Sequence, residues 1–473
     1  MDCCYKDKNT NYDLIIIGSG SAAFAGALRA VELGARVAMI ERGTVGGTCV
    51  NVGCIPSKTL IRTAEAKHRA EHPGFKGLNS KSIPISFETI IQEKDELVTT
   101  LQKAKYLEVL QSHEGIDLIE GQAFFVSSHE VQVGNQTIKG EHFIIATGAS
   151  PSIPPIPGLN DINYLTSTTA LELKKLPRSV VVLGGRYIAL ELAQMFQRMG
   201  TKVTILQRSS RILPTEDQDL TDELTKYLSQ EGMTIQTGVT IHNVSKSGSL
   251  QVNYEREGET QSICADQLLI ATGRRPNTNQ LNLENIGVNL NTDGSIKTNE
   301  YGQTSQSHIY AAGDVIGDPA FVYTAAYEGN LAVENALNGN SKVRDYSIVP
   351  SVIFTDPQVA RVGLNELQAK EKKIDVDVSN LTMDNVPRAL AARDTRGFVK
   401  LLKKKGTDQL AGASILAPEG SELLMEITLA MKYKIPISDI ASTFHPYLTL
   451  GEAVKLAAQT FNKDVKKLSC CAE

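Results

Sequence analysis

Three patterns in the sequence predict an α/β fold with several domains. An apolar strand that runs into a glycine-rich turn and a helix occurs twice, within residues 12–41 and within residues 179–206. Each copy is followed by a later strand that ends in Ala-Thr-Gly. After residue 349, strand-like runs are mixed with helical patterns. We therefore expect two Rossmann-like domains, related by an internal duplication, and a C-terminal α+β domain.

The composition is that of an ordinary globular chain. Its 473 residues are enough for several domains, and 48 basic against 53 acidic residues give a net charge of −5. This charge favours neither a nucleic-acid nor a membrane partner. The sequence has no apolar run of transmembrane length and no signal-peptide pattern at its start. We therefore expect a cytoplasmic protein, and in such a chain seven cysteines favour catalytic or metal-binding thiols over a disulfide framework.

The first unit has the full pattern of a dinucleotide-binding site. A strand over 12–17 is followed by Gly18-Ser19-Gly20-Ser21-Ala22-Ala23, a helix to about Leu33 and a second strand that ends at Glu41. In this pattern Gly18 permits the turn, Gly20 admits a pyrophosphate, Ala23 allows close helix packing, and Glu41 accepts hydrogen bonds from a ribose.

The segment 46–58 contains two cysteines, Cys49 and Cys54, in what we predict to be a turn of small residues. The following residues have a helical pattern, so Cys54 should lie at or just before a helix N-terminus, which favours the thiolate. Lys58 lies one helical turn further and adds a positive charge. The alternative is a structural disulfide or two inert buried thiols.

Between the two units we expect a charged helix over 87–113, a small antiparallel meander over 117–138, and a strand over 143–145 that ends near Gly148. The second unit begins with a strand over 179–183 and the turn Gly184-Gly185-Arg186-Tyr187-Ile188-Ala189. Arg186 replaces the middle glycine, so its side chain either crowds a pyrophosphate or turns away and contacts phosphate. The later Ala-Thr-Gly of this unit ends at Gly273.

The second strand of this unit ends at Gln207, where an NAD site has an acidic residue. Arg208 and Arg211 follow. A missing acid together with arginines favours the 2′-phosphate of NADPH, and the alternative is that both are ordinary loop arginines.

Together, Gly46-Gly47-Thr48-Cys49, the second cysteine Cys54, and Pro56-Ser57-Lys58 resemble the redox-active segment of the flavoprotein disulfide reductases, and the resemblance extends from about Tyr12 to Phe461. It implies a bound FAD, an Asp314 that contacts its ribityl chain, a pair between Lys58 and Glu191 near the flavin, and a homodimer. The predicted cofactor-binding residues are Gly18, Gly20, Ala23, Glu41, Thr48, Lys58, Gly148, Asp314, Gly184, Arg186, Ala189, Arg208, Arg211 and Gly273.

The same resemblance predicts the domain boundaries. Residues 1–152 form the first part of the FAD-binding domain, 153–273 the NADPH-binding domain, 274–346 the return segment of the FAD-binding domain, and 347–473 the dimerisation domain. A separate N-terminal metal-binding domain is not expected.

The C-terminal part is similar to the mercuric reductases, a branch of that family. The matching residues are Pro446-Tyr447-Leu448-Thr449, the run 455–461 and the ending Cys470-Cys471-Ala472-Glu473. His445 is a departure from this branch, since thiol-disulfide reductases have a histidine there with a glutamate five positions later. That position here is Leu450, and the nearest following glutamate is Glu452, so we expect a dismantled acid-base dyad.

The resemblance implies NADPH-dependent reduction of Hg(II) to Hg(0) through FAD. Mercuric ion is soft and prefers two thiolates. Cys470 and Cys471 would capture it from thiol complexes, and Cys49 with Cys54 would hold it in a site shared between the two subunits. Tyr187 and Tyr447 would lie near the metal path, and His445 is a further candidate catalytic residue.

Two other functions stay open from the sequence. One is a disulfide reductase of the glutathione-reductase or lipoamide-dehydrogenase type. The other is a metal-sequestering protein on a flavoprotein scaffold, which the intact Cys49, Cys54, Lys58, Glu191 and Asp314 disfavour. Cys3 and Cys4 are either a substitute metal site or part of a tail, and we expect Cys264 to be an ordinary strand residue.

Overall fold

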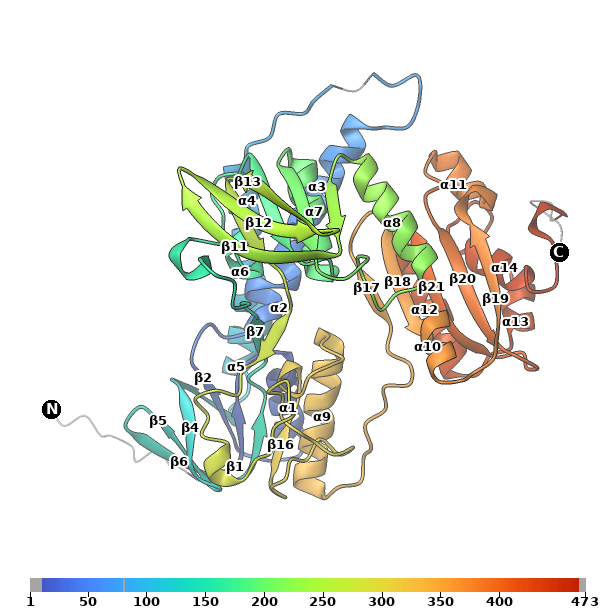
Figure 1. Ribbon diagram of the computed structural model, residues 1–473. Helices are drawn as coiled ribbons and strands as arrows, with labels where there is room; N and C mark the ends of the chain where they lie inside the picture. Colours follow the sequence, from blue (N-terminus) through green and yellow to red (C-terminus); the bar gives the residue numbers. More distant parts are fainter. Residues whose placement is uncertain (1–10, 80, 468–473) are drawn as a thin grey trace. The chain divides into compact units, whose positions relative to one another are not determined.

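The computed structural model describes residues 11–79 and 81–467, and the chain divides into two compact units (Figure 1). Unit 1 contains the chain up to Ser57 together with Ile91–Ser152 and Gly273–Asp345, and unit 2 contains Lys58–Ile90, Ile153–Thr272 and the chain from Tyr346. Three of the divisions fall at or next to the predicted domain boundaries. Residues 58–90, which the sequence placed with the first domain, belong to unit 2 instead.

Unit 1 is built on a sheet in the order β3-β2-β1-β6-β5-β4, with β16 also paired to β6. Its strands are β1 (Asn11–Ile17), β2 (Val37–Glu41), β3 (Ile116–Glu120), β4 (Ala123–Ser127), β5 (Glu130–Val133), β6 (Gln136–Ile145) and β16 (Ile309–Ala311). The pairs β3-β2, β2-β1, β1-β6 and β6-β16 are parallel, and only β4, β5 and β6 form an antiparallel meander. The prediction of one meander over 117–138 was therefore wrong for β3, which extends the parallel sheet.

The apolar run of β1 is explained by burial on both faces of this sheet. Ile15 and Ile17 belong to one hydrophobic cluster, whereas Leu14 and Ile16 belong to another. A strand covered on both sides has no polar face, so its sequence does not alternate.

Helix α1 (Ser21–Glu32) packs against α9 (Val322–Asn338) at backbone distance. A Cβ on Gly329 would lie 2.1 Å from the carbonyl oxygen of Ala22, so only glycine fits there. The other elements of unit 1 are α2 (Gly47–Val52), the π-helix η1 (Lys103–Leu107), α5 (Glu108–Gln111), β7 (Ala149–Pro151), β15 (Arg274–Pro276), η3 (Glu284–Ile286) and η4 (Asp314–Ile316). Helices α3 (Cys54–Glu71) and α4 (Phe87–Gln102) each cross from one unit to the other along the chain.

Unit 2 contains the second parallel sheet, in the order β10-β9-β8-β14. Its strands are β8 (Ser179–Leu183), β9 (Lys202–Gln207), β10 (Thr234–Thr237) and β14 (Gln267–Ile270). A three-stranded antiparallel sheet follows β10, with strands β11 (Val239–Ser247), β12 (Ser249–Arg256) and β13 (Glu259–Ala265). The helical elements here are η2 (Leu159–Asp161), α6 (Ser167–Leu171), α7 (Tyr187–Met199) and α8 (Gln218–Gln230).

The C-terminal part of unit 2 is an α+β domain, as predicted. Its five-stranded antiparallel sheet has the order β17-β18-β21-β20-β19, formed by β17 (Ser351–Ile353), β18 (Gln358–Gly363), β21 (Leu410–Ala417), β20 (Phe398–Lys404) and β19 (Val376–Thr382). The helical elements are α10 (Glu366–Glu371), η5 (Met383–Asn385), α11 (Pro387–Ala392), α12 (Gly420–Lys432), α13 (Ile437–Ser442), α14 (Glu452–Gln459) and η6 (Val465–Lys467). Within the described ranges, none of the helices is long and apolar enough to cross a membrane.

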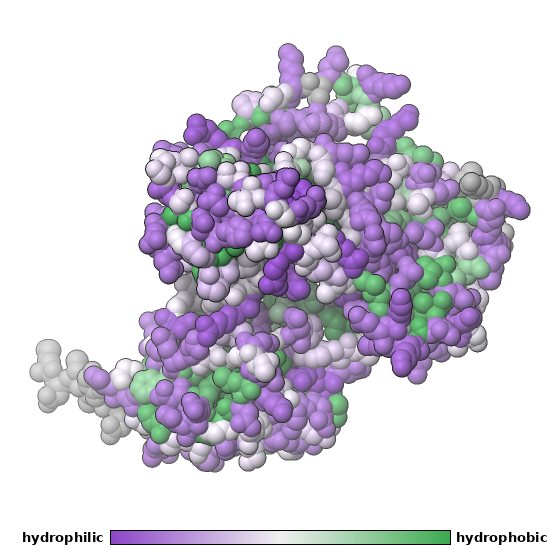
Figure 2. Space-filling view, in the orientation of Figure 1, coloured by the Kyte–Doolittle hydropathy of each residue, from purple (hydrophilic) through white to green (hydrophobic). Residues whose placement is uncertain are grey.

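Large apolar side chains remain exposed along one stripe of α12. Met425, Leu429 and Tyr433 follow each other at helical spacing and are 52%, 47% and 68% exposed. Figure 2 shows hydrophobic residues on the surface of the C-terminal α+β domain, in the region where Figure 1 draws β18, β21, α10 and α12. A stripe of this kind is typical of a surface that another protein covers.

Candidate active site

The two glycine-rich turns have the same geometry. Gly18 and Gly184 both have φ +116°, and a Cβ on either would lie 2.3 Å from the carbonyl oxygen of Ala146 or Ala271, respectively. Each of these alanines begins an Ala-Thr-Gly segment. The duplication seen in the sequence is therefore a duplicated contact between the first glycine of the turn and the end of a neighbouring strand.

In the first turn, Gly20 caps the N-terminus of α1, and the buried Ala23 lies on the helix face that packs inward. The carboxylate of Glu41 is held on both oxygens: Ser19 Oγ donates to Oε2 at 2.6 Å, and the Gly43 N–H donates to Oε1 at 2.7 Å. A helix N-terminus with an oriented carboxylate beside it fits the pyrophosphate and ribose of a dinucleotide.

Asp314 lies at the start of η4, directly after β16. Burial raises the pKa of its carboxyl group, and the Arg274 guanidinium, with Nε 3.7 Å from Oδ2, opposes this effect. Arg274 also donates a hydrogen bond to the carbonyl oxygen of Ala149. Gly148 and Gly273 flank these residues, and both have positive φ, with no atom within 4 Å of an added Cβ. Asp314 thus offers an oriented acceptor for hydroxyl groups beside an open backbone.

The second turn differs from the first in its polar residues. Arg186 caps α7 with an extended backbone and an exposed side chain, while Ala189 is buried. Gln207 is buried, and its Cγ lies 3.1 Å from where a Cβ of Gly185 would be. The side chain that replaces the expected acid therefore packs against the turn.

The two arginines after β9 have different surroundings. Arg211 donates to the carbonyl oxygens of Pro214 and Glu216, at 2.9 and 3.0 Å, so its guanidinium braces its own loop. Arg208 is exposed. Of the two, the exposed Arg208 is therefore the better candidate to meet a ligand phosphate.

The cysteine segment is more helical than the sequence indicated. Cys49 lies within the short helix α2, with Thr48 just before it, and Cys54 is the first residue of α3. The predicted turn over the whole segment was wrong, because the Asn51 side chain closes α2 by donating to the Val45 and Gly47 carbonyls. Both cysteines are partly buried. The position of Cys54 places its thiol at the positive end of an 18-residue helix.

This segment lies directly against the first glycine turn. A Cβ on Gly47 would lie 2.6 Å from Cα of Gly20, and the Gly46 N–H donates to Ser19 Oγ at 3.2 Å. The backbone contact fixes the cysteine helices to the turn that would receive the first dinucleotide.

Tyr106 is a residue of this site that the sequence analysis missed. It lies in the π-helical turn η1, and its ring meets Phe24 edge-on at 4.7 Å between centroids. Burial raises the pKa of its hydroxyl, and the charges of Cys49 and Cys54 raise it further. The sequence did not single out Tyr106, because it lies within residues 87–113, whose charged helical pattern indicated a solvated surface.

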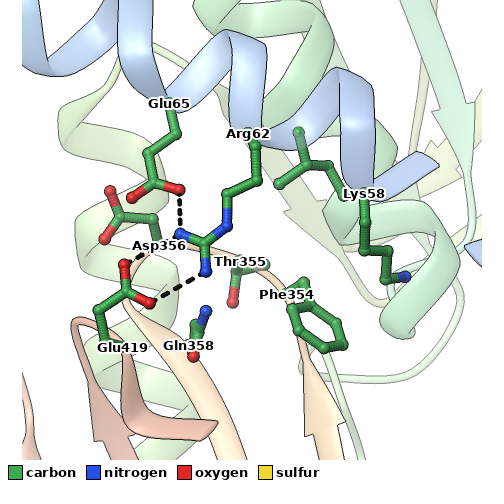
Figure 3. Close-up of a pocket in the computed structure, with 9 residues that line it drawn as sticks. Lys58, Arg62, Glu65, Phe354, Thr355, Asp356, Gln358 and Glu419 are labelled. Carbon is green, nitrogen blue, oxygen red and sulfur yellow. Dashed lines mark hydrogen bonds and ion pairs between the residues drawn. The ribbon is translucent and has the colours of Figure 1, made fainter. Parts of the chain in front are cut away.

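Lys58 and Glu191 form an ion pair, with Nζ 2.6 Å from Oε2. The second carboxylate oxygen of Glu191 accepts a hydrogen bond from the Phe354 N–H at 2.9 Å. Figure 3 shows Lys58 and Phe354 at one side of a cavity of about 10 Å³. Such a volume admits at most one water molecule, so this cavity is too small to be a substrate site. Arg62 closes its other side through bonds to Glu65 and Glu419 (Figure 3).

Helix α7 contacts the segment after β17 through a stripe of buried polar residues. Gln194 exchanges two hydrogen bonds of 2.8 Å with the backbone of Asp356. One turn further, Arg198 binds the carboxylates of Asp356 and Glu231 at 2.9 and 2.6 Å. Together with Glu191, these side chains make the same face of α7 the attachment surface for residues 354–356.

His445 has a carboxylate partner that the sequence did not reveal. Its Nε2 lies 2.8 Å from Oε1 of Glu426, which is on α12, and its Nδ1 lies 3.0 Å from the Thr443 carbonyl oxygen. The expected loss of the dyad was correct for Glu452, which does not bind the histidine. The expectation of a dismantled dyad did not consider a glutamate before the histidine, and Glu426, 19 positions earlier, provides a carboxylate.

The remaining predicted residues are exposed or outside the described ranges. Tyr187 begins α7 with 45% exposure, Tyr447 is 53% exposed, and Cys264 is exposed on β13. Cys3, Cys4, Cys470 and Cys471 lie outside the residues that the structure describes. Among the described residues, one acidic cluster (Asp217, Asp219 and Glu366) has metal-like spacing, but the Lys400 ammonium already binds all three carboxylates.

Comparison with known proteins identifies close relatives. Residues 12–329 match the pyridine nucleotide-disulphide oxidoreductase family, and residues 349–458 match its dimerisation domain. A mercuric reductase of Staphylococcus aureus is 48% identical over 98% of this chain and 85% of its own, and one of Streptomyces lividans is 43% identical over 98% and 99%. Among solved structures, the HOCl-induced flavoprotein disulfide reductase RclA from Escherichia coli, as its Cu(II) complex, aligns with a TM-score of 0.86. It is 34% identical, over 96% of this chain and 100% of its own.

Proposed function

This chain belongs to the pyridine nucleotide-disulphide oxidoreductase family, and on that premise we propose that it reduces mercuric ion to elemental mercury with NADPH and a bound FAD. The observation that carries the proposal is the backbone contact between Gly47 and Gly20, which fixes the cysteine helices against the dinucleotide turn. The relatives named mercuric reductase match nearly the whole chain, and this supports the choice of substrate.

Cys49 and Cys54 bind the mercuric ion in this proposal. Two thiolates satisfy a soft ion that prefers two ligands, and the N-terminus of α3 favours the thiolate form of Cys54. FAD, when bound, supplies the two electrons that NADPH delivers as a hydride. The overall reaction converts Hg(II) and NADPH into Hg(0), NADP⁺ and one proton, so the metal itself takes up no proton and needs no acid catalyst.

Gly18, Gly20, Ala23, Glu41, Thr48, Gly148 and Asp314 would hold the FAD. The fit is supported by the two oriented carboxylates, Glu41 and Asp314, and by the open backbone at Gly148. The second turn would hold NADPH through Gly184, Arg186, Ala189 and Gly273, with Arg208 at the 2′-phosphate. Lys58, paired with Glu191, would place a positive charge one helical turn after Cys54.

The match to the dimerisation domain and the apolar stripe of α12 support a homodimer. We place the active site between the two subunits, where Cys470 and Cys471 of one subunit would pass mercury from its thiol complexes to Cys49 and Cys54 of the other. Tyr187 and Tyr447 would line the path of the ion, since both rings are exposed.

Disulfide reduction is a second candidate, and the pair of His445 and Glu426 favours it. Both ring nitrogens of His445 lie within hydrogen-bond distance of oxygen atoms, and a ring N–H oriented in this way is the kind of group from which a departing thiolate could take a proton. A thiol-disulfide exchange needs such a proton, whereas the reduction of the metal does not.

One assay separates the two functions. NADPH oxidation is followed by absorbance with mercuric chloride in excess thiol and, separately, with glutathione disulfide or lipoamide. We expect turnover with mercury, and loss of it by at least about 100-fold in Cys49→Ala/Cys54→Ala. If only the disulfide is turned over, the proposed function changes from mercury reduction to disulfide reduction. If a protein loaded with FAD turns over neither substrate, both functions are refuted.

A further inference from the structure

We propose that Phe354 is a positioning residue for Lys58, a role that depends on the proposed function of the Lys58–Glu191 pair. Two separate contacts join Phe354 to this pair. Its ring centroid lies 4.9 Å from Lys58 Nζ, within the range of a cation–π interaction, and its N–H donates to Glu191 Oε1. One residue of the C-terminal domain therefore contacts both the cation and its counter-ion.

The ion pair fixes the lysine ammonium from one direction only. The Lys58 side chain is 32% exposed, and Nζ has its carboxylate partner Glu191 at 2.6 Å. The carboxylate is buried and accepts a second bond, whereas the lysine stem is flexible and partly exposed, so the carboxylate fixes one end of the pair better than the other. The aromatic face of Phe354 adds a second contact to the same ammonium and restricts the directions in which it can swing.

The backbone that carries the ring is held in place by its neighbours along the chain. Thr355 is 1% exposed, and Asp356 is attached to α7 through Gln194 and Arg198. Figure 3 shows Phe354, Thr355 and Asp356 in sequence along the side of the cavity that faces α3. These bonds hold the backbone of residues 354–356 against α7 independently of Lys58, so the Cα from which the ring projects toward Lys58 is fixed.

A double-mutant cycle tests this role. Phe354→Leu removes the ring but keeps the backbone N–H that binds Glu191, Lys58→Met removes the charge, and the double variant combines the two. We expect Phe354→Leu to lower kcat with thiol-bound mercury about 3- to 10-fold, with the KM for NADPH unchanged. In the Lys58→Met background, Phe354→Leu should lower kcat less than about twofold, because a residue that acts through Lys58 has nothing left to position.

Two further variants exclude a general packing effect. Phe354→Tyr retains an aromatic face and should restore kcat to within about twofold of the parent. Phe398→Leu is the matched control, because the Phe398 ring lies 5.6 Å from Lys400 Nζ in the same unit, away from the candidate site. It should leave kcat unchanged in both backgrounds. An equal loss from Phe354→Leu with and without Lys58, or no loss at all, would overturn the assignment.

The same cycle has a readout that needs neither mercury nor cofactor. Urea midpoints of the four proteins, followed by circular dichroism, should show that the Phe354→Leu and Lys58→Met effects are non-additive. Additive midpoint shifts would contradict the contact. Absent mercury turnover combined with non-additive midpoints would refute the proposed function and leave the positioning of Lys58 intact.

Discussion

At the scale of single residues, the proposed preference for NADPH involves two arginines with different neighbours. Arg211 is committed to the backbone carbonyls of its own loop, whereas Arg208 is exposed at the end of β9. From the sequence alone the two arginines are equivalent candidates, because both follow the missing acid. The hydrogen bonds of Arg211 distinguish them.

We predict that Arg208→Ala lowers the kcat/KM for NADPH about 10-fold or more while leaving that for NADH nearly unchanged. The reason is the loss of a guanidinium that would meet the 2′-phosphate. Arg211→Ala is the matched variant: it should lower the melting temperature by a few degrees and affect both cofactors alike. The assignment fails if Arg211→Ala alone alters the ratio between the two cofactors.

At the scale of elements, α3 and α7 meet in a buried network that the sequence pattern could not reveal. His68 on α3 has its pKa lowered to about 4, first by burial and then by the charge of Arg198, while Glu231 and Asp356 oppose the shift and His72 adds to it. Asp356 has its pKa lowered because Arg396 and Arg198 outweigh the effect of burial. The folded protein thus keeps His68 neutral and Asp356 charged.

His68 should make stability depend on pH. His68 takes up a proton near pH 6.5 in the unfolded chain but only near pH 4 in the folded protein. Its contribution to the free energy of unfolding is therefore complete above pH 6.5 and falls as the pH drops toward 4. Allowing for partial exposure, we expect a loss of about 1 kcal/mol between pH 7.5 and 5 from this residue. Urea unfolding at both pH values should show a smaller difference for His68→Gln than for the wild type. Equal differences would show that His68 does not contribute.

The elements themselves were largely predictable, and the reason lies in local patterns. The strand, glycine turn and helix at 11–32 and at 179–199 follow from an apolar run next to residues that permit a tight turn. Strand β3 was misassigned because a half-buried strand has the same local pattern in a parallel sheet and in a meander.

Contacts between distant residues were far less predictable. Glu426 beside His445, Phe354 beside Lys58 and Tyr106 near the cysteines each come from another part of the chain. Their positions are set by packing over many residues, which no spacing along the sequence encodes. The pair of Lys58 and Glu191 could be expected only because the resemblance to a family supplied it.

At the scale of the whole molecule, the proposed delivery of mercury between subunits can be tested by complementation. Cys470→Ala/Cys471→Ala subunits are mixed with Cys49→Ala/Cys54→Ala subunits under conditions that allow exchange. Half of the dimers should be mixed and contain one intact site of two, so turnover of thiol-bound mercury should return to about a quarter of the wild-type value. Neither parent should turn over, and a mixture that contains mixed dimers but stays inactive would show that delivery occurs within one subunit.

The contact of α1 with α9 also affects the order in which the protein can be completed during synthesis. Residues 21–32 leave the ribosome early, but the helix that covers them, with Gly329 against the Ala22 carbonyl, is translated some 300 residues later. Strand β16, which covers the edge of β6, is also late. The inserted segment 153–272 contains a complete parallel sheet of its own and can collapse in the meantime. The Rossmann-like domain whose synthesis begins first is therefore completed after the second one. The apolar face of α1 has to be kept from aggregating until α9 has been made.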